Sequence, residues 1–450
     1  MKIAVVGTGI SGMSAAWLLN SRHDVTVYEQ DGRIGGHSNT IDVVSGAGTQ
    51  PVDTGFIVYN EAAYPNLVAL FAHLQVPTQP SDMSFAVSLD GGALEYSGTD
   101  LRGLFAQKRN MLNPRFWSML SDIRRFYRDA RHQLAELGDA DMPLGAYLDR
   151  FGYGAAFRDD HLLPMAAAIW SAPPATMLDY PAASFLRFHD NHGLLQISNR
   201  PQWRTVTGGS RSYVERLTRA FAHRIRVGVG AACVRRMDDG VEIRDSRGDV
   251  ERFDAAVFAT HADDTLSLLD DASALEREIL GAFRYSDNTA IVHTDPALMP
   301  RRRAAWSSWN YLGSSRRSAD AEHRPEACTV TYWMNRLQEF QTPKPLFVTL
   351  NPQRGPDPAC FIQLEHYTHP IFDAGAMRAQ KRLWSLQGRR NTWFCGSYFG
   401  SGFHEDGLQS GLAAAEALGG VKRPWTVPNE SGRVHIRPHH AERRALEFVS

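Results

Sequence analysis

Short apolar runs near the N-terminus are separated by glycines and by one helix-forming segment. The run Ile3–Val6 predicts a buried strand, and Gly7, Gly9 and Gly12 follow it with GxGxxG spacing. A helix-forming stretch then leads to a second apolar run that ends at Glu29. This order of strand, glycine turn, helix and strand predicts the start of a parallel α/β sheet.

The glycines lie where a bound dinucleotide would need them. Gly7 allows a tight turn, Gly9 allows the backbone to approach a pyrophosphate, and Gly12 allows the helix to pack closely on the strand. Ile10 and Ser11 open that helix, whose N-terminal amides would face the phosphates. The spacing predicts a dinucleotide site formed by these five residues.

Two further features narrow the cofactor. Glu29 can accept hydrogen bonds from an adenosine ribose and would repel a 2′-phosphate, so NADP is not expected. Arg33 with the doublet Gly35 and Gly36 resembles the second phosphate-contacting signature of flavoproteins in the amine oxidase superfamily, which implies FAD. His37, next to the doublet, is placed to contact a phosphate or the flavin.

Three separated stretches carry the signals of a cofactor domain. We predict a discontinuous FAD-binding domain from residues 1–78, 200–265 and 385–420, with a substrate domain from residues 79–199 and 266–384 between them. Residues 421–450 are rich in Pro, Arg and His and have no strong period, which predicts a tail packed on the surface or partly disordered.

The first two stretches each carry a candidate flavin or adenine contact. In the strand and turn Val52–Ile57, Gly55 and Phe56 could let the backbone approach the flavin, and an ordinary glycine turn is equally compatible. Two short strands joined by Asp238 and Asp239 predict a hairpin, which would place backbone groups of Val234 near the adenine.

The third stretch, residues 393–411, reads as a strand, a glycine-rich crossing and a helix that opens with small residues. Its backbone amides could serve an anion or a flavin carbonyl. The candidate cofactor contacts in it are Gly396, Ser397, Asp406, Gly407 and Leu408.

The substrate region is less regular. Residues 101–137 predict a long helical region broken at Asn113 and Pro114, with basic residues around its apolar positions. Residues 280–370 predict a strand-rich region, in which Thr329–Trp333 and Leu346–Leu350 are the clearest strands.

Composition excludes several classes of function. The 48 basic and 49 acidic residues leave a net charge of -1, which argues against a nucleic-acid partner. Cys233, Cys328, Cys360 and Cys395 are far apart, so neither a disulfide framework nor a zinc site is indicated. No apolar run is long enough to span a bilayer, and the first residues carry no secretory pattern, so we expect a cytoplasmic protein.

Together, these motifs resemble the amine oxidase superfamily of FAD-dependent oxidoreductases. The chain is also similar to a branch of predicted NAD/FAD-binding proteins encoded beside cyclopropane fatty acid synthases, or fused to them in plants. The phrases that carry this closer resemblance are Gly35–Thr40, Val52–Asn60, Ala305–Tyr311, Thr331–Asn335, Thr349–Pro352 and Gly402–Gly407. The resemblance implies an α/β fold, with a Rossmann-like FAD-binding domain and an inserted mixed α+β substrate domain.

Two departures from the superfamily affect the expected reaction. Many members carry Gly-Asp where this chain has Gly396-Ser397, so the serine hydroxyl or Asp406 would have to bind the ribityl chain. Many amine oxidases also hold a water near the flavin with a lysine on the strand after residue 284. None of the five lysines of this chain falls there, which weakens simple amine oxidation.

The third stretch, residues 393–411, also supplies candidate catalytic residues. Phe403 and Tyr398 could form an aromatic slot, although aromatic residues at strand ends are more often core. His404 and Glu405 could relay a proton to or from the substrate or flavin. The alternative is that Asp406 caps the following helix while Glu405 supports its dipole.

A basic and aromatic surface is the last feature. Arg301, Arg302 and Arg303 precede Trp306, Trp309 and Tyr311, and with the basic region 101–137 they suit contact with phospholipid head groups at the inner face of the membrane. A solvated charged face is the alternative.

These observations predict an FAD-dependent oxidoreductase that acts on a hydrophobic substrate, a fatty acyl chain of a phospholipid or fatty acid. An amine or polyamine oxidase is the second hypothesis. The third is a flavin-containing accessory subunit of a lipid-modifying methyltransferase, which would be its partner.

Overall fold

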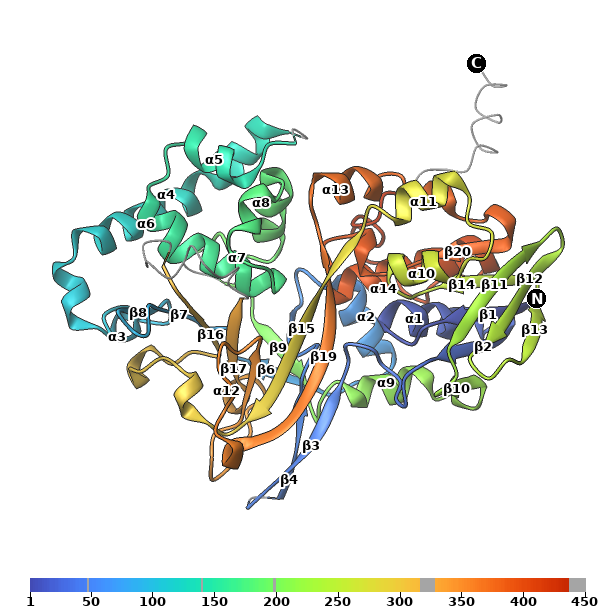
Figure 1. Ribbon diagram of the computed structural model, residues 1–450, viewed down its shortest axis with the longest axis horizontal. Helices are drawn as coiled ribbons and strands as arrows, with labels where there is room; N and C mark the ends of the chain where they lie inside the picture. The colour runs from blue at the N-terminus through green and yellow to red at the C-terminus, as the bar shows by residue number, and fades with distance from the viewer. Residues whose placement is uncertain (47, 139–140, 197–199, 316–327, 437–450) are drawn as a thin grey trace.

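The computed structural model describes residues 1–46, 48–138, 141–196, 200–315 and 328–436. A parallel sheet with its helices lies at one end of the molecule, and a mixed sheet with a helical group lies at the other (Figure 1). The described part of the chain contains no helix with both the length and the apolar character that a bilayer crossing requires.

The parallel sheet has the strand order β10-β2-β1-β14-β20. Its strands are β1 (Lys2–Val6), β2 (Asp24–Glu29), β10 (Ile225–Val227), β14 (Ala255–Phe258) and β20 (Thr392–Phe394). Val5 in the central strand pairs with Val27 on one side and Val257 on the other, and all three side chains are buried. Segments far apart in the sequence therefore share one core, as parallel strands buried on both faces require.

Two helices pack on each other beside this sheet. They are α1 (Ile10–Leu19) and α14 (His404–Gly419). A Cβ on Gly411 would lie 2.2 Å from the Ser11 carbonyl oxygen, so only glycine permits this approach. The small residues of the predicted third stretch therefore serve helix packing.

A three-stranded antiparallel sheet, β11 (Ala231–Met237), β12 (Gly240–Asp245) and β13 (Val250–Phe253), covers the same end of the molecule. Met237 pairs with Gly240 across the turn, which confirms the predicted hairpin.

The mixed sheet has the order β19-β15-β18-β17-β16-β7-β8. Its strands are β7 (Phe85–Leu89), β8 (Leu94–Ser97), β15 (Arg284–His293), β16 (Trp309–Gly313), β17 (Thr329–Trp333), β18 (Phe347–Leu350) and β19 (Phe361–Ile371). The long β15 and β19 run side by side between the two ends of the molecule (Figure 1). The strands predicted at 329–333 and 346–350 are confirmed, the second starting one residue later.

Helices cover this sheet. They are α3 (Leu101–Leu104), α4 (Pro114–Leu137), α5 (Leu144–Arg150), α6 (Ala155–Phe157), α7 (Leu163–Trp170) and α8 (Ala182–Asn191). The predicted break is confirmed, because the Asn113 side chain accepts a hydrogen bond from the Arg115 amide and Pro114 occupies the first helical position.

The remaining strands and α-helices lie between the two ends or pack on one of them. They are β3 (Thr40–Ser45), β4 (Gly48–Asp53), β5 (Tyr59–Asn60), β6 (Thr78–Ser81), β9 (Trp203–Val206), α2 (Pro65–His73), α9 (Arg211–Thr218), α10 (Ala262–Leu268), α11 (Ala274–Leu280), α12 (Met334–Leu337) and α13 (Ala374–Gln380).

The described part of the predicted tail is firmly packed. The buried Arg423 guanidinium pairs with Glu416 at 2.8 Å, and Arg433 pairs with Asp406 at 3.1 Å. Residues 421–436 are therefore held to α14 by ion pairs, so this part of the predicted tail has the packed form of the two expected. Residues 437–450 lie outside the described residues.

Candidate active site

A cavity of about 1570 Å³ extends from the carboxyl ends of β1, β2 and β14 to the helices α7 and α8. Ligands of open α/β sheets bind outside the carboxyl ends of the strands. The volume exceeds the roughly 300–1,000 Å³ of sites for drug-sized ligands, so the cavity has room for a dinucleotide and a second molecule.

The glycine turn forms one end of the cavity, and its glycines serve different purposes. Gly7 adopts φ +102°, which favours glycine. A Cβ on Gly9 would have no protein atom within 4 Å, whereas one on Gly12 would lie 2.0 Å from the Gly7 carbonyl oxygen. Gly9, Ile10 and Ser11 line the cavity, and Gly12 does not. Gly9 thus leaves space for a ligand, and Gly12 lets α1 pack on the strand.

Glu29 and Arg33 lie beside this turn. One Glu29 carboxylate oxygen accepts hydrogen bonds from the Thr8 amide, at 3.0 Å, and from the Thr8 hydroxyl, and the other accepts from the Asp31 amide at 2.8 Å. Arg33 donates to the Gly36 carbonyl at 2.7 Å. Glu29, Arg33 and Gly36 line the cavity, so the phosphate and ribose end is ordered by the chain's own contacts.

His37 follows this loop with one nitrogen that has no protein partner. Its Nε2 is buried without a hydrogen bond to the described residues, and its ring lies 5.0 Å from the Tyr367 ring and 5.3 Å from the His369 ring. Burial, and secondarily the charge of His369, holds the His37 pKa well below its usual value, so the imidazole is neutral. An unpaired buried nitrogen beside a cavity fits a ligand that supplies its partner.

Gly55 and Gly35 shape the same loop. A Cβ on Gly55 would lie 2.2 Å from the His37 carbonyl oxygen, which accepts a hydrogen bond from the Phe56 amide at 2.8 Å. Gly55 and Phe56 line the cavity. Gly35, with φ +112°, does not line it and accepts from the Ser38 amide at 2.9 Å.

The rings of His404 and Phe56 stack face to face with their centroids 3.8 Å apart, and both residues line the cavity. His404 Nε2 lies 2.6 Å from the Tyr213 hydroxyl and 3.1 Å from the Ser38 hydroxyl. Burial lowers the pKa of His404 to about 3, so the ring is neutral and fixed in orientation. The expected position of His404 beside the reacting centre is compatible with this geometry.

Glu405 and Asp406 do not line the cavity, which corrects their expected roles. Glu405 accepts hydrogen bonds from the Asn66 and Leu67 amides, each at 3.0 Å, and so caps the first turn of α2. Helix N-terminal amides need such acceptors, and this use leaves Glu405 no path to a substrate.

Asp406 instead caps its own helix, as the alternative predicted. It accepts from the Phe403 amide at 2.8 Å and the Ser401 amide at 3.0 Å, and it pairs with Arg433. Its carboxylate is buried in these contacts, so it cannot bind a ribityl chain.

Three further predicted cofactor residues lie elsewhere, while Gly396 and Ser397 do line the cavity. Gly407 packs against α1, where a Cβ would lie 2.8 Å from the Ser11 hydroxyl oxygen, and Leu408 is fully buried in the core. Val234 is also fully buried, and its carbonyl accepts from the Asp270 amide at 3.2 Å. These three expectations are therefore wrong.

Gly230 and Ala231 line the cavity in place of Val234. They stand at the start of β11, close to the carboxyl end of β2, because Val229 donates to the Glu29 carbonyl at 2.8 Å. The glycines in the sequence Val227-Gly228-Val229-Gly230 were the signal that could have identified this approach.

The predicted slot of Tyr398 and Phe403 does not form as a pair, although both residues line the cavity. The Tyr398 ring packs at 5.1 Å from both Phe283 and Phe399, in the core beside the parallel sheet. Phe403 stacks on Phe188 at 4.8 Å and meets Trp170 edge-on at 6.3 Å. The aromatic wall of the cavity is therefore made by Phe403 with residues of α7 and α8.

The far arm of the cavity is mostly apolar. Its lining includes Met165, Ala168, Ile169, Trp170, Phe188 and Leu194 from the region of α7 and α8. None of the five lysines lines the cavity. The arm has the character of a site for a hydrophobic group.

Two histidines in this arm are held neutral. His192 Nδ1 donates to the Phe188 carbonyl at 2.9 Å, and burial lowers the His192 pKa to about 3. Burial lowers the His161 pKa to about 4. The Nε2 atoms of both rings are buried without a partner among the described residues. The arm thus offers polar atoms but no positive charge from these rings.

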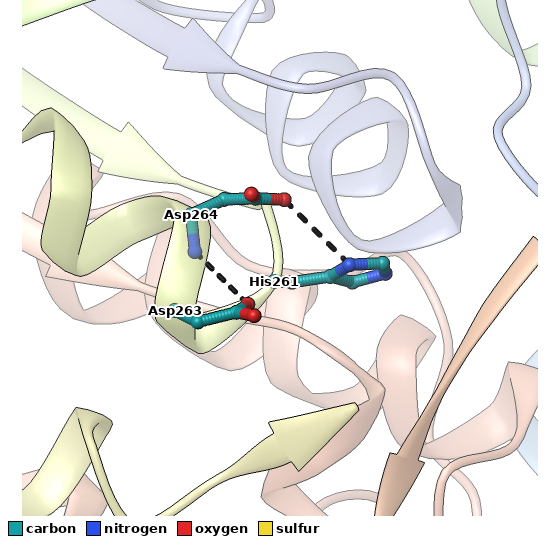
Figure 2. Close-up of side chains that lie close together, drawn as sticks. All are labelled: His261, Asp263 and Asp264. Atoms are coloured by element: carbon teal, nitrogen blue, oxygen red, sulfur yellow. Dashed lines mark hydrogen bonds and ion pairs between the residues drawn. The ribbon is translucent and has the colours of Figure 1, made fainter. Parts of the chain in front are cut away.

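A cluster at the start of α10 was missed by the sequence analysis. His261, Asp263 and Asp264 lie together, and His261 Nδ1 is 3.6 Å from an Asp264 carboxylate oxygen (Figure 2). His261 Nδ1 also lies 3.1 Å from the Thr368 hydroxyl, and both His261 and Asp264 line the cavity. The sequence feature that could have identified this cluster is its position just after β14, at the carboxyl edge of the sheet.

Comparisons with known proteins agree with this fold. The family model described as flavin containing amine oxidoreductase matches residues 10–294. Similar solved structures include cyclohexylamine oxidase from Brevibacterium oxydans IH-35A, with 15% identity, TM-score 0.66 and coverage of 93% of this chain and 98% of that chain.

Two other similar structures are of proteins with different names. A CLA-producing fatty acid isomerase from P. acnes has 16% identity and TM-score 0.63, with 92% of this chain and 97% of that chain covered. A putative protoporphyrinogen oxidase from Exiguobacterium sp. 255-15 has 16% identity and TM-score 0.62, with 93% and 98% covered. No curated protein matches the sequence.

The residues present fit the cofactor of this family. Gly9 leaves open space at a helix N-terminus, Glu29 and Arg33 border it, and His37 Nε2 has no protein partner. The predicted amine oxidase-like fold and FAD are thus confirmed. The chain belongs to the flavin-containing amine oxidoreductase family and is an FAD-dependent oxidoreductase.

Proposed function

We propose that this oxidoreductase acts on a hydrophobic substrate, an acyl chain of a fatty acid or phospholipid, and removes a hydride from it in a desaturation-type reaction. The observation that carries this proposal is the apolar arm beside α7 and α8. Met165, Ala168 and Ile169 line it with aliphatic surface, and Trp170 and Phe188 add aromatic surface. Burial of an alkyl chain there would contribute roughly 0.8 kcal/mol per methylene group.

One carboxylate that lines the cavity is already compensated by the chain's own residues. Asp82 lines the cavity, but it accepts from the Ser308 hydroxyl at 2.5 Å and pairs with Arg336 at 3.1 Å. Its negative charge is therefore compensated before a ligand arrives. A protonated amine in the arm would meet His161 and His192, which are both neutral.

The chain's residues orient the substrate and receive its proton. When bound, FAD supplies a hydride acceptor at the flavin N5. Phe403 and Phe188 would hold the alkyl chain by packing, and the surrounding apolar side chains would exclude water. The neutral His37 Nε2, which has no protein partner, is the atom we assign to accept the proton released with the hydride, and its lowered pKa means that it passes this proton on to solvent and does not retain it.

An amine or polyamine oxidase is the second candidate. The observation in its favour is the aromatic wall of Trp170, Phe188 and Phe403, whose ring faces could attract an ammonium group. The absence of a lysine from the cavity lining removes a feature that the resemblance associates with many amine oxidases.

The proposed function is tested by anaerobic absorbance of the flavin-loaded protein. Fatty acids and phospholipids in detergent are added to one sample, and small amines to another. We expect the lipid to bleach the flavin band near ~450 nm and the amines to leave it unchanged, because substrate oxidation reduces the flavin. Bleaching by amines alone would overturn the proposal in favour of the second candidate. A flavin that responds to neither would favour the accessory-subunit hypothesis, in which a lipid methyltransferase is the partner.

A further inference from the structure

An exposed apolar patch lies at the end of the molecule that carries the apolar arm. Leu101 is 75% exposed, Leu112 is 89% exposed, and Trp117 is 51% exposed, and Met111 between them is 48% exposed. These four residues belong to α3, the 3₁₀ helix Lys108–Leu112 and the first turn of α4. We call them the apolar patch.

The apolar patch is one ordered surface. The Trp117 indole donates to the Met111 carbonyl at 2.8 Å, and its ring lies 5.9 Å from that of Phe105. The Phe105 amide in turn donates to the Leu101 carbonyl at 3.1 Å. Large apolar side chains that an ordered backbone keeps exposed to solvent are typical of surfaces that bind a partner or a membrane.

Basic residues surround the apolar patch. Arg102, Lys108 and Arg109 are exposed within it, and α3 lies against the 3₁₀ helix Arg303–Ala305, which brings the exposed Arg301 and Arg303 to its border. Among the described residues, none of these five side chains is ion-paired with a carboxylate. Residues 101–117 contain no acidic residue, and the neighbouring Glu95 is compensated by Arg302 at 2.8 Å.

The apolar patch adjoins the cavity. Gly98 and Thr99 line the cavity, and Asp100, the next residue, caps α3 directly before Leu101. Tyr96, in the strand that leads to this turn, lines the cavity as well. A lipid held at the apolar patch would therefore be separated from the cavity lining by a few residues of chain.

We propose that the apolar patch and its five cations form a docking surface for an anionic phospholipid bilayer, next to the entrance of the acyl chain into the cavity. Exposed Leu and Trp side chains enter the interfacial region of a bilayer, and Lys and Arg attract anionic head groups. The inference extends the proposed function, because it supplies the surface from which an acyl substrate would be taken. Its test is a binding measurement that needs no turnover.

The test is sedimentation of the full-length, flavin-loaded protein with vesicles. We expect binding to vesicles of phosphatidylglycerol mixed with phosphatidylcholine and at least tenfold weaker binding to phosphatidylcholine alone. The pair Arg102→Gln and Lys108→Gln should each weaken binding about fivefold, since each basic residue near an anionic surface contributes about 1 kcal/mol. High salt should weaken binding in the same direction.

The apolar contribution is tested with the double variant Leu101→Glu, Leu112→Glu. Both side chains are exposed, so the variant should keep the melting temperature and flavin content of the wild type while binding falls at least tenfold. Val250→Glu is the matched control, because Val250 is 54% exposed on β13 at the far end of the molecule and should leave binding unchanged. Equal binding by the double variant and the wild type would overturn the proposal. So would an absence of vesicle binding together with dimers that the double variant abolishes, since the apolar patch would then meet a second copy of the chain.

A failure of the docking surface is distinguishable from a failure of the proposed function. Lipids dispersed in detergent would still bleach the flavin of the double variant if only the docking inference were wrong. Vesicle binding would persist, without bleaching, if only the proposed substrate were wrong.

Discussion

The two ends of the cavity are built in different ways. At the parallel sheet the wall is largely backbone, with Gly9 leaving open space and Gly12 holding α1 within reach of the Gly7 carbonyl. At the helical end the wall is made of side chains, such as Ala168 and Phe188, from separate helices. The first end can be read from residue spacing because glycine positions decide where a backbone can approach a ligand. The second depends on which side chains the tertiary fold brings together.

A substitution in the glycine turn should have the largest effect on stability at the parallel-sheet end of the cavity. Gly12→Ala would place a methyl group 2.0 Å from the Gly7 carbonyl oxygen, so the helix must move. We expect the free energy of unfolding to fall by about 3 kcal/mol and bound flavin to be lost. Urea unfolding and the absorbance of the purified protein measure both.

Gly9→Ala is the matched variant, because no protein atom lies within 4 Å of its added methyl group. It should keep the fold of the flavin-free protein while it lowers flavin affinity. If Gly12→Ala retained wild-type stability and flavin content, the distinction between the two glycines would fail.

The free energy of unfolding should be almost as sensitive to the buried ion pair that holds residues 421–436 to α14. Arg433→Met leaves the buried Asp406 carboxylate without its ion-pair partner, which lies 3.1 Å away in the wild type. Breaking a buried pair on one side costs about 3 kcal/mol. Denaturant unfolding should show this loss. Arg128→Met removes an exposed pair with Asp129 and should leave the free energy of unfolding close to that of the wild type. Similar losses for the two variants would contradict the assigned role of residues 421–436.

At the helical end, stability should depend on side chains that stay uncharged, in contrast to the buried ion pair of Arg433 and Asp406. Burial lowers the pKa of His161 to about 4 and that of His192 to about 3, whereas free histidine titrates near 6.5. Below about pH 6.5 the unfolded chain takes up protons that these folded rings refuse, so stability is lost as the pH falls towards 4. Burial raises the pKa of Asp53 to about 6, and this carboxyl acts in the opposite sense, losing stability as the pH rises through 6.

His192→Phe sharpens this prediction with the smallest expected effect. At pH 7.5 the variant should lose about 1 kcal/mol, the net value of the hydrogen bond from Nδ1 to the Phe188 carbonyl. At pH 5 the difference should shrink, because the variant no longer has this histidine to protonate on unfolding. Melting temperatures across pH 7.5 to 5 measure it, and parallel curves for the two proteins would refute the neutral assignment of His192.

The fold could be predicted further than the site. Gly7 to Gly12, Glu29 and the break at Asn113 each report a local backbone requirement, and the structure has the expected strand, turn or cap at each place. The polar cluster of Glu405 and Asp406 misled the prediction, because a carboxylate that caps a helix has the same sequence appearance as one that faces a substrate. Only the positions of Asn66, Leu67 and Arg433, distant in sequence, distinguish the two uses.

The aromatic wall was partly hidden for the same reason. Phe403 was identified, but Trp170 and Phe188 come from helices whose apolar spacing is also that of an ordinary core. His261 followed a strand end without a glycine or a spacing motif to mark it. Residues of this kind can be assigned to the site only from the tertiary structure, which shows that they line one cavity.

The most direct test of the central claim is anaerobic lipid titration of Ala168→Phe beside the wild type, both loaded with flavin. Ala168 lines the apolar arm, so a larger side chain there should obstruct an acyl chain without touching the glycine turn. We predict that lipid bleaches the wild-type flavin and that the variant, with the same flavin content, responds at least tenfold more slowly, a barrier increase of about 1.4 kcal/mol. Equal bleaching of the two proteins, or bleaching by amines only, would contradict the claim that the arm binds an acyl chain.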